Sequence, residues 1–130
     1  MNILGIDYGK RKVGLATADS ALATPLSTIK YQEPEDLLGK LDLVVQEQGI
    51  SEIVVGVTEG EMEEEQMRFG KLLEEKFGLP VHFQDETLST HDAQILAREA
   101  GIGQLKRRRK EDAYAATIIL QGYLDSLHSL

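Results

Sequence analysis

The chain has 130 residues, no cysteine and a formal net charge of −8. This length favours one domain over residues 1–130, and the lack of cysteine excludes disulfides and thiolate metal sites. The sequence begins without a basic leader and has no apolar run near the ~20 residues of a membrane span. We therefore expect a cytoplasmic protein with no membrane partner.

The first predicted element is a hairpin that carries a carboxylate near its tip. Residues 3–6 read as a short apolar strand that ends at Asp7, residues 8–12 as a polar turn, and residues 13–16 as the returning strand. The simplest interpretation of Asp7 is a residue that begins a turn. The alternative is a functional carboxylate at the end of a strand.

The alternation of the first strand assigns its side chains to two faces. Leu4 and Ile6 share one face, so Gly5 and Asp7 lie on the other. Glycine at positions 5 and 14 lets a bulky ligand or another backbone approach that second face.

Periodicity and turn residues predict the remaining elements in chain order. They are a strand over 23–30, a helix that opens at 33–36 and stops at Gly49, a strand over 50–57, a helix with the core stripe Met62, Phe69, Leu73 and Phe77, a strand over 81–86, a helix from Ser89 with Gly101 past its end, a basic loop over 101–110 and a helix over 111–127. This order predicts an α/β fold. Its mixed five-stranded sheet combines a three-strand antiparallel meander with two parallel strands, and helices cover both faces.

Asp112 is the carboxylate whose placement matters most. It lies one turn before Ala116 on the apolar stripe of the last predicted helix, so it faces the sheet and needs a partner. It is either an N-cap or one member of a cluster with Asp7 and Glu86, which each end a strand at the same edge of the sheet. Three carboxylates without thiolates suit Mg²⁺ or Mn²⁺, and two such ions would act on a phosphodiester.

Two basic clusters flank these acids in the sequence and hold eight of the fourteen basic residues. They are Lys10, Arg11 and Lys12, and Lys106, Arg107, Arg108, Arg109 and Lys110. Screening limits a charge's reach to about 8 Å at physiological salt, so a local basic patch binds phosphates even on an acidic protein. The clusters predict nucleic-acid binding with little base specificity.

At these residues the sequence resembles the YqgF (RuvX) family, relatives of the RuvC resolvase in the ribonuclease-H-like superfamily. The resemblance rests on GIDYGKRKVGLATAD, VVGV, DETLSTHDA and KEDAYAATIIL, four ordered motifs over almost the whole chain. It implies a ribonuclease-H-like fold and a metal-dependent nuclease that trims the precursor of 16S rRNA or resolves branched DNA. By position, Asp7, Glu86 and Asp112 match the family's acidic residues, and Asp85 matches the acid beside the second.

Three departures from the family pattern leave alternatives open. Thr87 replaces an arginine, Thr58 replaces a proline, and residues 59–66 (EGEMEEEQ) replace a small glycine-containing loop. These changes are compatible with a weakened enzyme or an RNA-binding module without turnover. Glu59 also competes with Glu86 and Asp85 as the second metal ligand. A short strand edge predicts a monomer or a weak homodimer.

Overall fold

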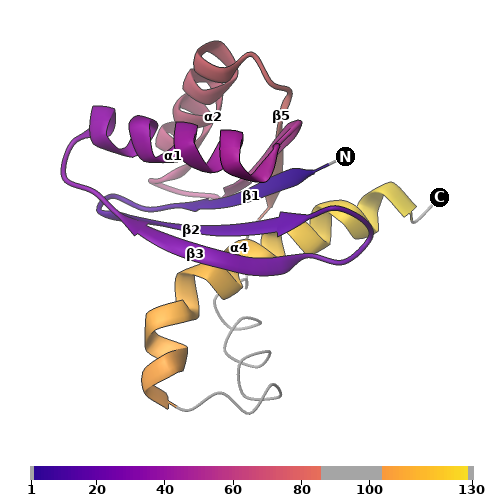
Figure 1. Ribbon diagram of the computed structural model, residues 1–130. Coiled ribbons are helices and arrows are strands. Elements are labelled where there is room, and N and C mark those ends of the chain that lie inside the picture. The colour runs from indigo at the N-terminus through magenta and orange to yellow at the C-terminus, as the bar shows by residue number, and fades with distance from the viewer. Residues whose placement is uncertain (1, 86–103, 129–130) are drawn as a thin grey trace.

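A computed structural model describes residues 2–85 and 104–128, with side chains over 2–85 and 112–127. Figure 1 shows one sheet with helices above and below it. The strands are β1 (Ile3–Tyr8), β2 (Lys12–Ala18), β3 (Thr24–Lys30), β4 (Glu52–Val57) and β5 (Val81–Asp85), and the helices are α1 (Pro34–Gln48), α2 (Glu63–Phe77) and α4 (Gln104–His128). The predicted helix after Ser89 lies outside the described residues.

The sheet has the strand order β3-β2-β1-β4-β5. β1 pairs antiparallel with β2, and β2 pairs antiparallel with β3. β4 lies parallel to both β1 and β5. The predicted mixed sheet is confirmed, and β3, which contains Pro25, is an edge strand. The ends of β1, β3, β4 and β5 and the start of β2 therefore meet at one edge, here called the carboxyl edge.

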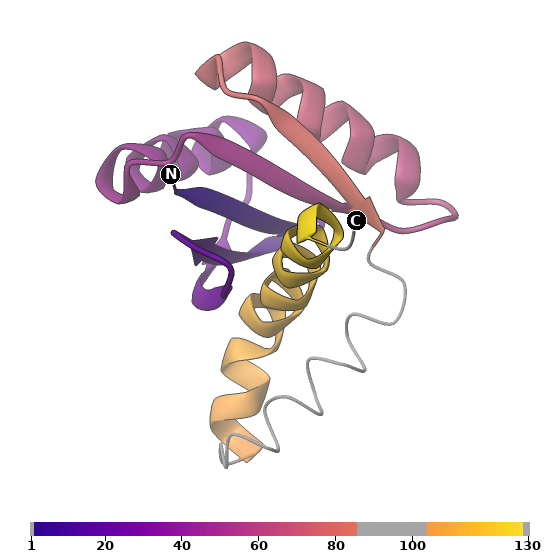
Figure 2. The ribbon, with the colours of Figure 1, turned by 90° about the vertical axis from the view of Figure 1, so that its right-hand side faces the viewer.

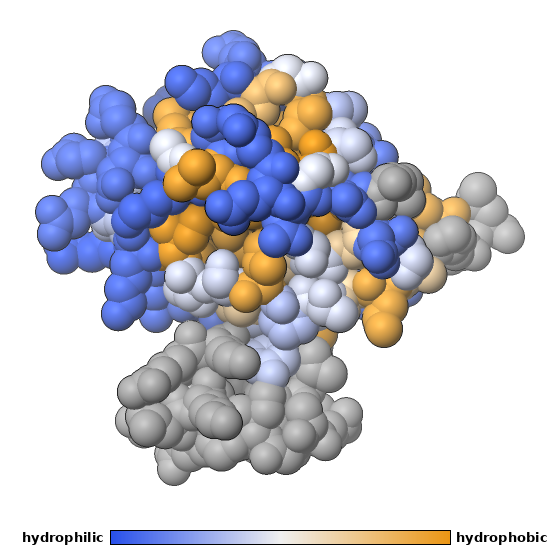
Figure 3. All heavy atoms as spheres, viewed as in Figure 1, coloured by the Kyte–Doolittle hydropathy of each residue, from blue (hydrophilic) through white to orange (hydrophobic). Residues whose placement is uncertain are grey.

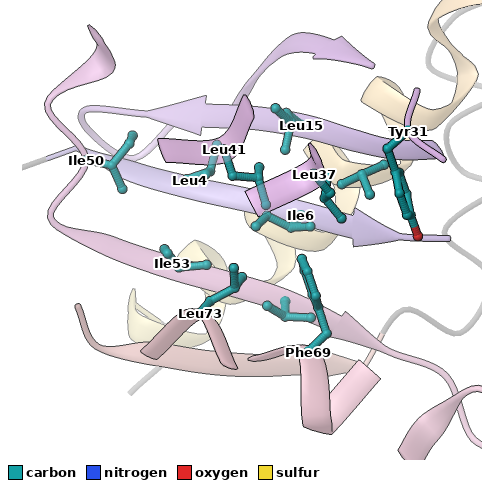
Figure 4. Close-up of a cluster of buried hydrophobic side chains, with 12 residues drawn as sticks. Leu4, Ile6, Leu15, Tyr31, Leu37, Leu41, Ile50, Ile53, Phe69 and Leu73 are labelled. Atoms are coloured by element: carbon teal, nitrogen blue, oxygen red, sulfur yellow. The ribbon is translucent and has the colours of Figure 1, made fainter. Parts of the chain in front are cut away.

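One face of the sheet is covered by α1 and α2. Leu37 of α1 and Phe69 of α2 pack on strand residues such as Leu4 and Ile6, which lie on the predicted face. Figure 4 shows this cluster, with Tyr31 at one end and Ile50 at the other. Each fully buried side chain of this size contributes about 1.5–3 kcal/mol relative to an exposed one.

The opposite face of the sheet is covered by α4. Ala116 and Leu120 of α4 pack against Ile3 of β1 and Val54 of β4. Val54 belongs to this cluster, whereas its neighbour Val55 belongs to the other, so β4 is buried on both faces. Figure 2 shows α4 crossing this face and its first turns extending past the sheet.

The last helix begins earlier than the sequence predicts. Residues 104–110, expected in a basic loop over 101–110, form the first two turns of α4. Lysine and arginine favour helix, and nothing over 104–110 breaks it, because the glycines at 101 and 103 precede it. Asp112 therefore lies inside the helix, and the interpretation of Asp112 as an N-cap is wrong.

The core stripe of α2 also differs from the prediction at one turn. Met62 is the N-cap residue of α2, while Gln66, one turn further on, is 2% exposed. The Gln66 side-chain oxygen accepts a hydrogen bond of 2.8 Å from the backbone N–H of Thr58, just past β4. A buried amide therefore fixes the start of the segment between β4 and α2.

The surface over α1 and α2 is mostly hydrophilic, with apolar side chains showing between the polar ones (Figure 3). Leu43 of α1 and Leu72 of α2 are among the exposed apolar residues. Within the described residues, every helix is too short or too polar to cross a membrane.

Candidate active site

An open groove of about 800 Å³ lies at the carboxyl edge, where β1 ends and β2 begins. It combines acidic and basic side chains from three strands and two helices. Its lining residues are Asp7, Gly9, Lys10, Arg11, Lys12, Lys30, Tyr31, Gln32, Asp36, Lys40 and Asp112. The groove thus brings together Asp7 and Asp112, which are 105 positions apart in the sequence. Figure 3 shows a hydrophilic surface at this end of the sheet, on the left.

Asp7 reaches the groove because of its position on β1. It is the penultimate residue of the strand and lies opposite Gly14 of β2 in the antiparallel register. Strand alternation puts Asp7 on the face that Gly5 shares, under α4.

Asp112 reaches the groove because α4 packs backbone to backbone on the sheet. A Cβ atom added at Gly14 would overlap the carbonyl group of Asp112. A Cβ atom at Gly5 would lie 2.7 Å from Cβ of Leu120. The two glycines thus admit the helix backbone, which is one of the two alternatives expected from the sequence.

The carboxylate of Asp112 forms an ion pair with Lys12. The Lys12 Nζ atom lies 3.1 Å from Asp112 Oδ2, and the two side chains are 56% and 27% exposed. Such a solvent-accessible pair contributes at most about 1 kcal/mol. The Lys12 ammonium group therefore neutralises the Asp112 carboxylate, and a bound cation can displace this ammonium group at a small cost in free energy.

The turn between β1 and β2 is held by hydrogen bonds from Tyr31. The Tyr31 hydroxyl donates to the Gly9 carbonyl at 2.6 Å, and the Tyr31 backbone N–H donates to the Arg11 carbonyl at 3.0 Å. Figure 4 shows the Tyr31 hydroxyl oxygen beside the end of β1. Burial is the main cause that raises the pKa of Tyr31, so its hydroxyl remains a donor at neutral pH. The turn that carries Lys10, Arg11 and Lys12 is therefore fixed to the end of β3.

Several predicted site residues do not line the groove or cannot be placed in it. Glu86 lies outside the described residues. Lys106, Arg107, Arg108, Arg109 and Lys110 lie on α4, but their side chains are outside the described part.

The two acids that compete with Glu86 are both exposed and line no part of the groove. Asp85 ends β5, and Glu59 follows β4. β4 separates β5 from β1, which puts the backbones of β1 and β5 about 10 Å apart. Over residues 2–85 and 112–127, no three acidic, histidine or cysteine side chains are close enough to hold a metal ion.

Lys30, Tyr31 and Lys40 line the groove, although the sequence patterns did not indicate them. Lys30 ends β3, and Lys40 lies on α1, where its Nζ atom contacts Asp36 at 3.3 Å. The predicted meander could have indicated Lys30 and Tyr31, because it places the end of the third strand beside the start of the second.

The donor set of the groove fits a hard divalent cation. Asp7 and Asp112 supply carboxylate oxygens, and Mg²⁺ commonly binds through one or two carboxylates together with substrate phosphates. None of the described residues that line the groove is a histidine. This composition disfavours zinc and copper relative to Mg²⁺ or Mn²⁺.

The sheet order and the helices on both faces define a ribonuclease-H-like fold, in agreement with solved structures. The RuvC protein of T. thermophilus in complex with a Holliday junction substrate matches with a TM-score of 0.66 and 18% identity, over 99% of this chain and 97% of that one. The Fowlpox virus resolvase in complex with Holliday junction DNA matches with a TM-score of 0.66 and 11% identity, over 98% and 99%.

The sequence identifies the family within this fold. The RuvX family, described as Holliday junction resolvase, matches residues 1–126, and the chain belongs to it. A relative from Oenococcus oeni is 36% identical over 96% of this chain and 94% of its own length. One from Desulfitobacterium hafniense is 37% identical over 96% and 92%. Both carry the name "Putative pre-16S rRNA nuclease".

Proposed function

We propose that this protein is a nuclease that hydrolyses phosphodiester bonds of structured RNA, with the precursor of 16S rRNA as its substrate. The observation that carries the proposal is the groove, where Asp7 and Asp112 lie beside Lys10, Arg11 and Lys12. Membership of the RuvX family and the names of the relatives support nuclease chemistry. The ribosomal precursor as substrate rests on those names alone.

Asp7 and Asp112, with Glu86 as a third ligand, would hold Mg²⁺ or Mn²⁺. When bound, one or two such ions supply the positive charge that activates a water and stabilises the leaving oxygen of an in-line displacement. Carboxylates suit these ions because both are hard and prefer oxygen. Asp85 and Glu59 are the alternatives to Glu86.

The basic residues bind and orient the substrate. Lys10, Arg11 and Lys12 supply donors for phosphates on either side of the scissile one. The basic residues over 106–110, whose backbone forms the start of α4, are proposed as a second group of phosphate contacts. Contacts to phosphate fix the register of the strand and carry little sequence information. Structure in the RNA, rather than its base sequence, is then what directs cleavage.

The experiment that tests this proposal is cleavage of a precursor 16S rRNA fragment with Mn²⁺ or Mg²⁺. Asp7→Asn, Glu86→Gln and Asp112→Asn are each expected to abolish cleavage while the circular dichroism spectrum stays unchanged. Cleavage at the normal rate by all three variants would overturn the proposal.

A second candidate substrate is branched DNA. The family description and the two solved resolvases favour it, because each refers to Holliday junctions. A four-way DNA junction offered in the same assay separates the two, since the proposal predicts faster cleavage of the RNA.

A third candidate is an RNA-binding module without turnover. The segment after β4 exposes Glu59, Glu61, Glu63, Glu64 and Glu65, and these charges lower the local affinity for phosphate. This candidate predicts RNA binding that is sensitive to salt, independent of metal and not followed by cleavage.

A further inference from the structure

The groove extends beyond the carboxylates to a second wall at the end of β3. Lys30 ends β3, and it lies opposite Lys12 in the antiparallel register of β2 and β3. Opposed side chains on neighbouring strands have Cβ atoms about 5 Å apart, and like charges there destabilise the sheet. The two ammonium groups thus share one face of the sheet at an energetic cost that a bound anion would remove.

The charges of the groove leave this wall positive. Lys12 is paired with Asp112, and Lys40 is paired with Asp36. Lys10, Arg11 and Lys30 also line the groove. None of the three forms an ion pair with another of the described residues. In all, five cationic side chains and three acidic ones, Asp7, Asp36 and Asp112, line the groove. Positive charge therefore accumulates locally on a protein whose net charge is −8.

The backbone that carries these cations is fixed before any ligand binds. The Lys40 ammonium donates to the Lys30 carbonyl at 2.9 Å, which attaches the end of β3 to α1. Tyr31 donates to the Gly9 and Arg11 carbonyls, which attaches the same end to the β1–β2 turn. Ordering of the backbone is thus not a cost of binding, and preorganisation of this kind favours affinity.

We infer that Lys30, together with Lys10 and Arg11, binds backbone phosphates of the substrate. These phosphates lie on the same nucleic-acid strand as the phosphate held at Asp7 and Asp112, and next to it. This inference rests on the proposed function, because it assigns the path of the same substrate. The strand runs from the carboxylates across the start of β2 and over the end of β3. Lys30 contributes one phosphate contact and no base specificity.

The test is the salt dependence of binding to a fluorescent single-stranded RNA in EDTA, between 50 and 200 mM KCl. Each phosphate contact contributes about 0.7 to the slope of log K against log salt concentration for a single strand. Lys30→Gln is expected to lower the slope by about 0.7 and to weaken binding about two- to fivefold. Lys30→Arg is expected to keep the slope.

Lys71→Gln is the matched control, because Lys71 is an exposed lysine of α2 that does not line the groove. It is expected to keep the wild-type slope. An unchanged slope in Lys30→Gln, with a reduced slope in Lys10→Gln, would overturn the path over β3 and leave the proposed function standing. No RNA binding by the wild type would overturn both.

Discussion

Gly14 lies directly opposite Asp7 across β1 and β2, and the backbone of Asp112 packs on that same glycine. A single residue without a side chain therefore contacts the backbones of both aspartates. Because the contact is between backbones, it leaves α4 no room to adjust by rotating a side chain. The position of Asp112 relative to Asp7 depends on this contact.

Gly14→Ala is expected to displace α4 from β2. The added methyl group overlaps the Asp112 carbonyl, so we expect a loss of about 1–3 kcal/mol in the free energy of unfolding. We also expect about a 100-fold fall in RNA cleavage at temperatures where the variant is folded, because a 1 Å misplacement of a catalytic group costs about that much.

Gly39→Ala is the matched control for this substitution. Gly39 is an exposed residue of α1, and a Cβ atom there meets nothing within 4 Å. Alanine is expected to stabilise the helix by up to about 1 kcal/mol and to leave cleavage unchanged. Wild-type cleavage by Gly14→Ala would show that the close approach of α4 does not position Asp112.

Tyr31→Phe is expected to loosen the cationic turn. The variant loses the 2.6 Å hydrogen bond to the Gly9 carbonyl, which costs about 1–2 kcal/mol in the free energy of unfolding. RNA affinity is expected to fall because the turn that carries the cations is less ordered. The slope of log K against log salt concentration is expected to stay the same, because the variant removes no charge. Urea denaturation and the binding titration measure the two effects.

Tyr31 also makes stability depend on pH in the alkaline range. Burial raises the pKa of Tyr31 above the 10.0 of an unfolded chain. Below pH 10 the hydroxyl is protonated in both states, so its contribution is complete. Above pH 10 the unfolded chain loses the proton first, and stability falls as the pH rises.

Tyr31→Phe is therefore expected to show a shallower decline in stability above pH 10 than the wild type. Part of the decline remains, because burial and the charge of Glu52 raise the pKa of Tyr123 as well. Parallel curves for the two proteins between pH 10 and 11 would contradict this assignment.

Lys12→Gln is expected to strengthen the binding of Mn²⁺ in the absence of nucleic acid. The Lys12 ammonium lies 3.1 Å from Asp112 Oδ2, where it competes with a bound cation for the carboxylate. The exposure of the pair limits the gain to about fivefold in Kd. Lys40→Gln, which breaks a comparable pair with Asp36, serves as the control and is expected to change Mn²⁺ affinity less. Weaker Mn²⁺ binding by Lys12→Gln would contradict the prediction.

Gln66→Leu is expected to destabilise the protein by about 1–3 kcal/mol. The substitution removes a buried acceptor from the Thr58 N–H, whose bond to Gln66 is 2.8 Å long. Gln46→Leu on the exposed face of α1 is the control and is expected to change stability by less than about 0.5 kcal/mol. Equal thermal midpoints for the two variants would show that the Gln66 bond is dispensable.

The sheet could be predicted because its strands carry simple patterns. Alternation placed Leu4 and Asp7 on opposite faces, and the continuous apolar run over 50–57 indicated a strand buried on both sides. The meander followed from three short strands with no intervening helix. These patterns depend on residues close in sequence, so they need no knowledge of tertiary contacts.

The start of α4 and the ion pair of Asp112 could not be predicted in the same way. Residues 104–110 combine charge with high helix propensity, so composition alone did not separate a basic loop from a helix. The contact between Lys12 and Asp112 joins residues 100 positions apart and depends on how α4 crosses β2. Gln66 resembles a surface residue in the sequence, and its hydrogen bond with the Thr58 N–H, which helps to offset the cost of burying its amide, could not be read from the sequence pattern.

The proposed activity requires Asp7 and Asp112 to act as one metal-binding site for a phosphodiester. Calorimetric titration of Mn²⁺ into the protein tests it most directly, with a non-cleavable RNA analogue present so that phosphates complete the site. We expect Mn²⁺ binding by the wild type, and we expect both Asp7→Asn and Asp112→Asn to remove it. Equal Mn²⁺ binding by the wild type and both variants, or no binding by the wild type with the RNA present, would contradict it.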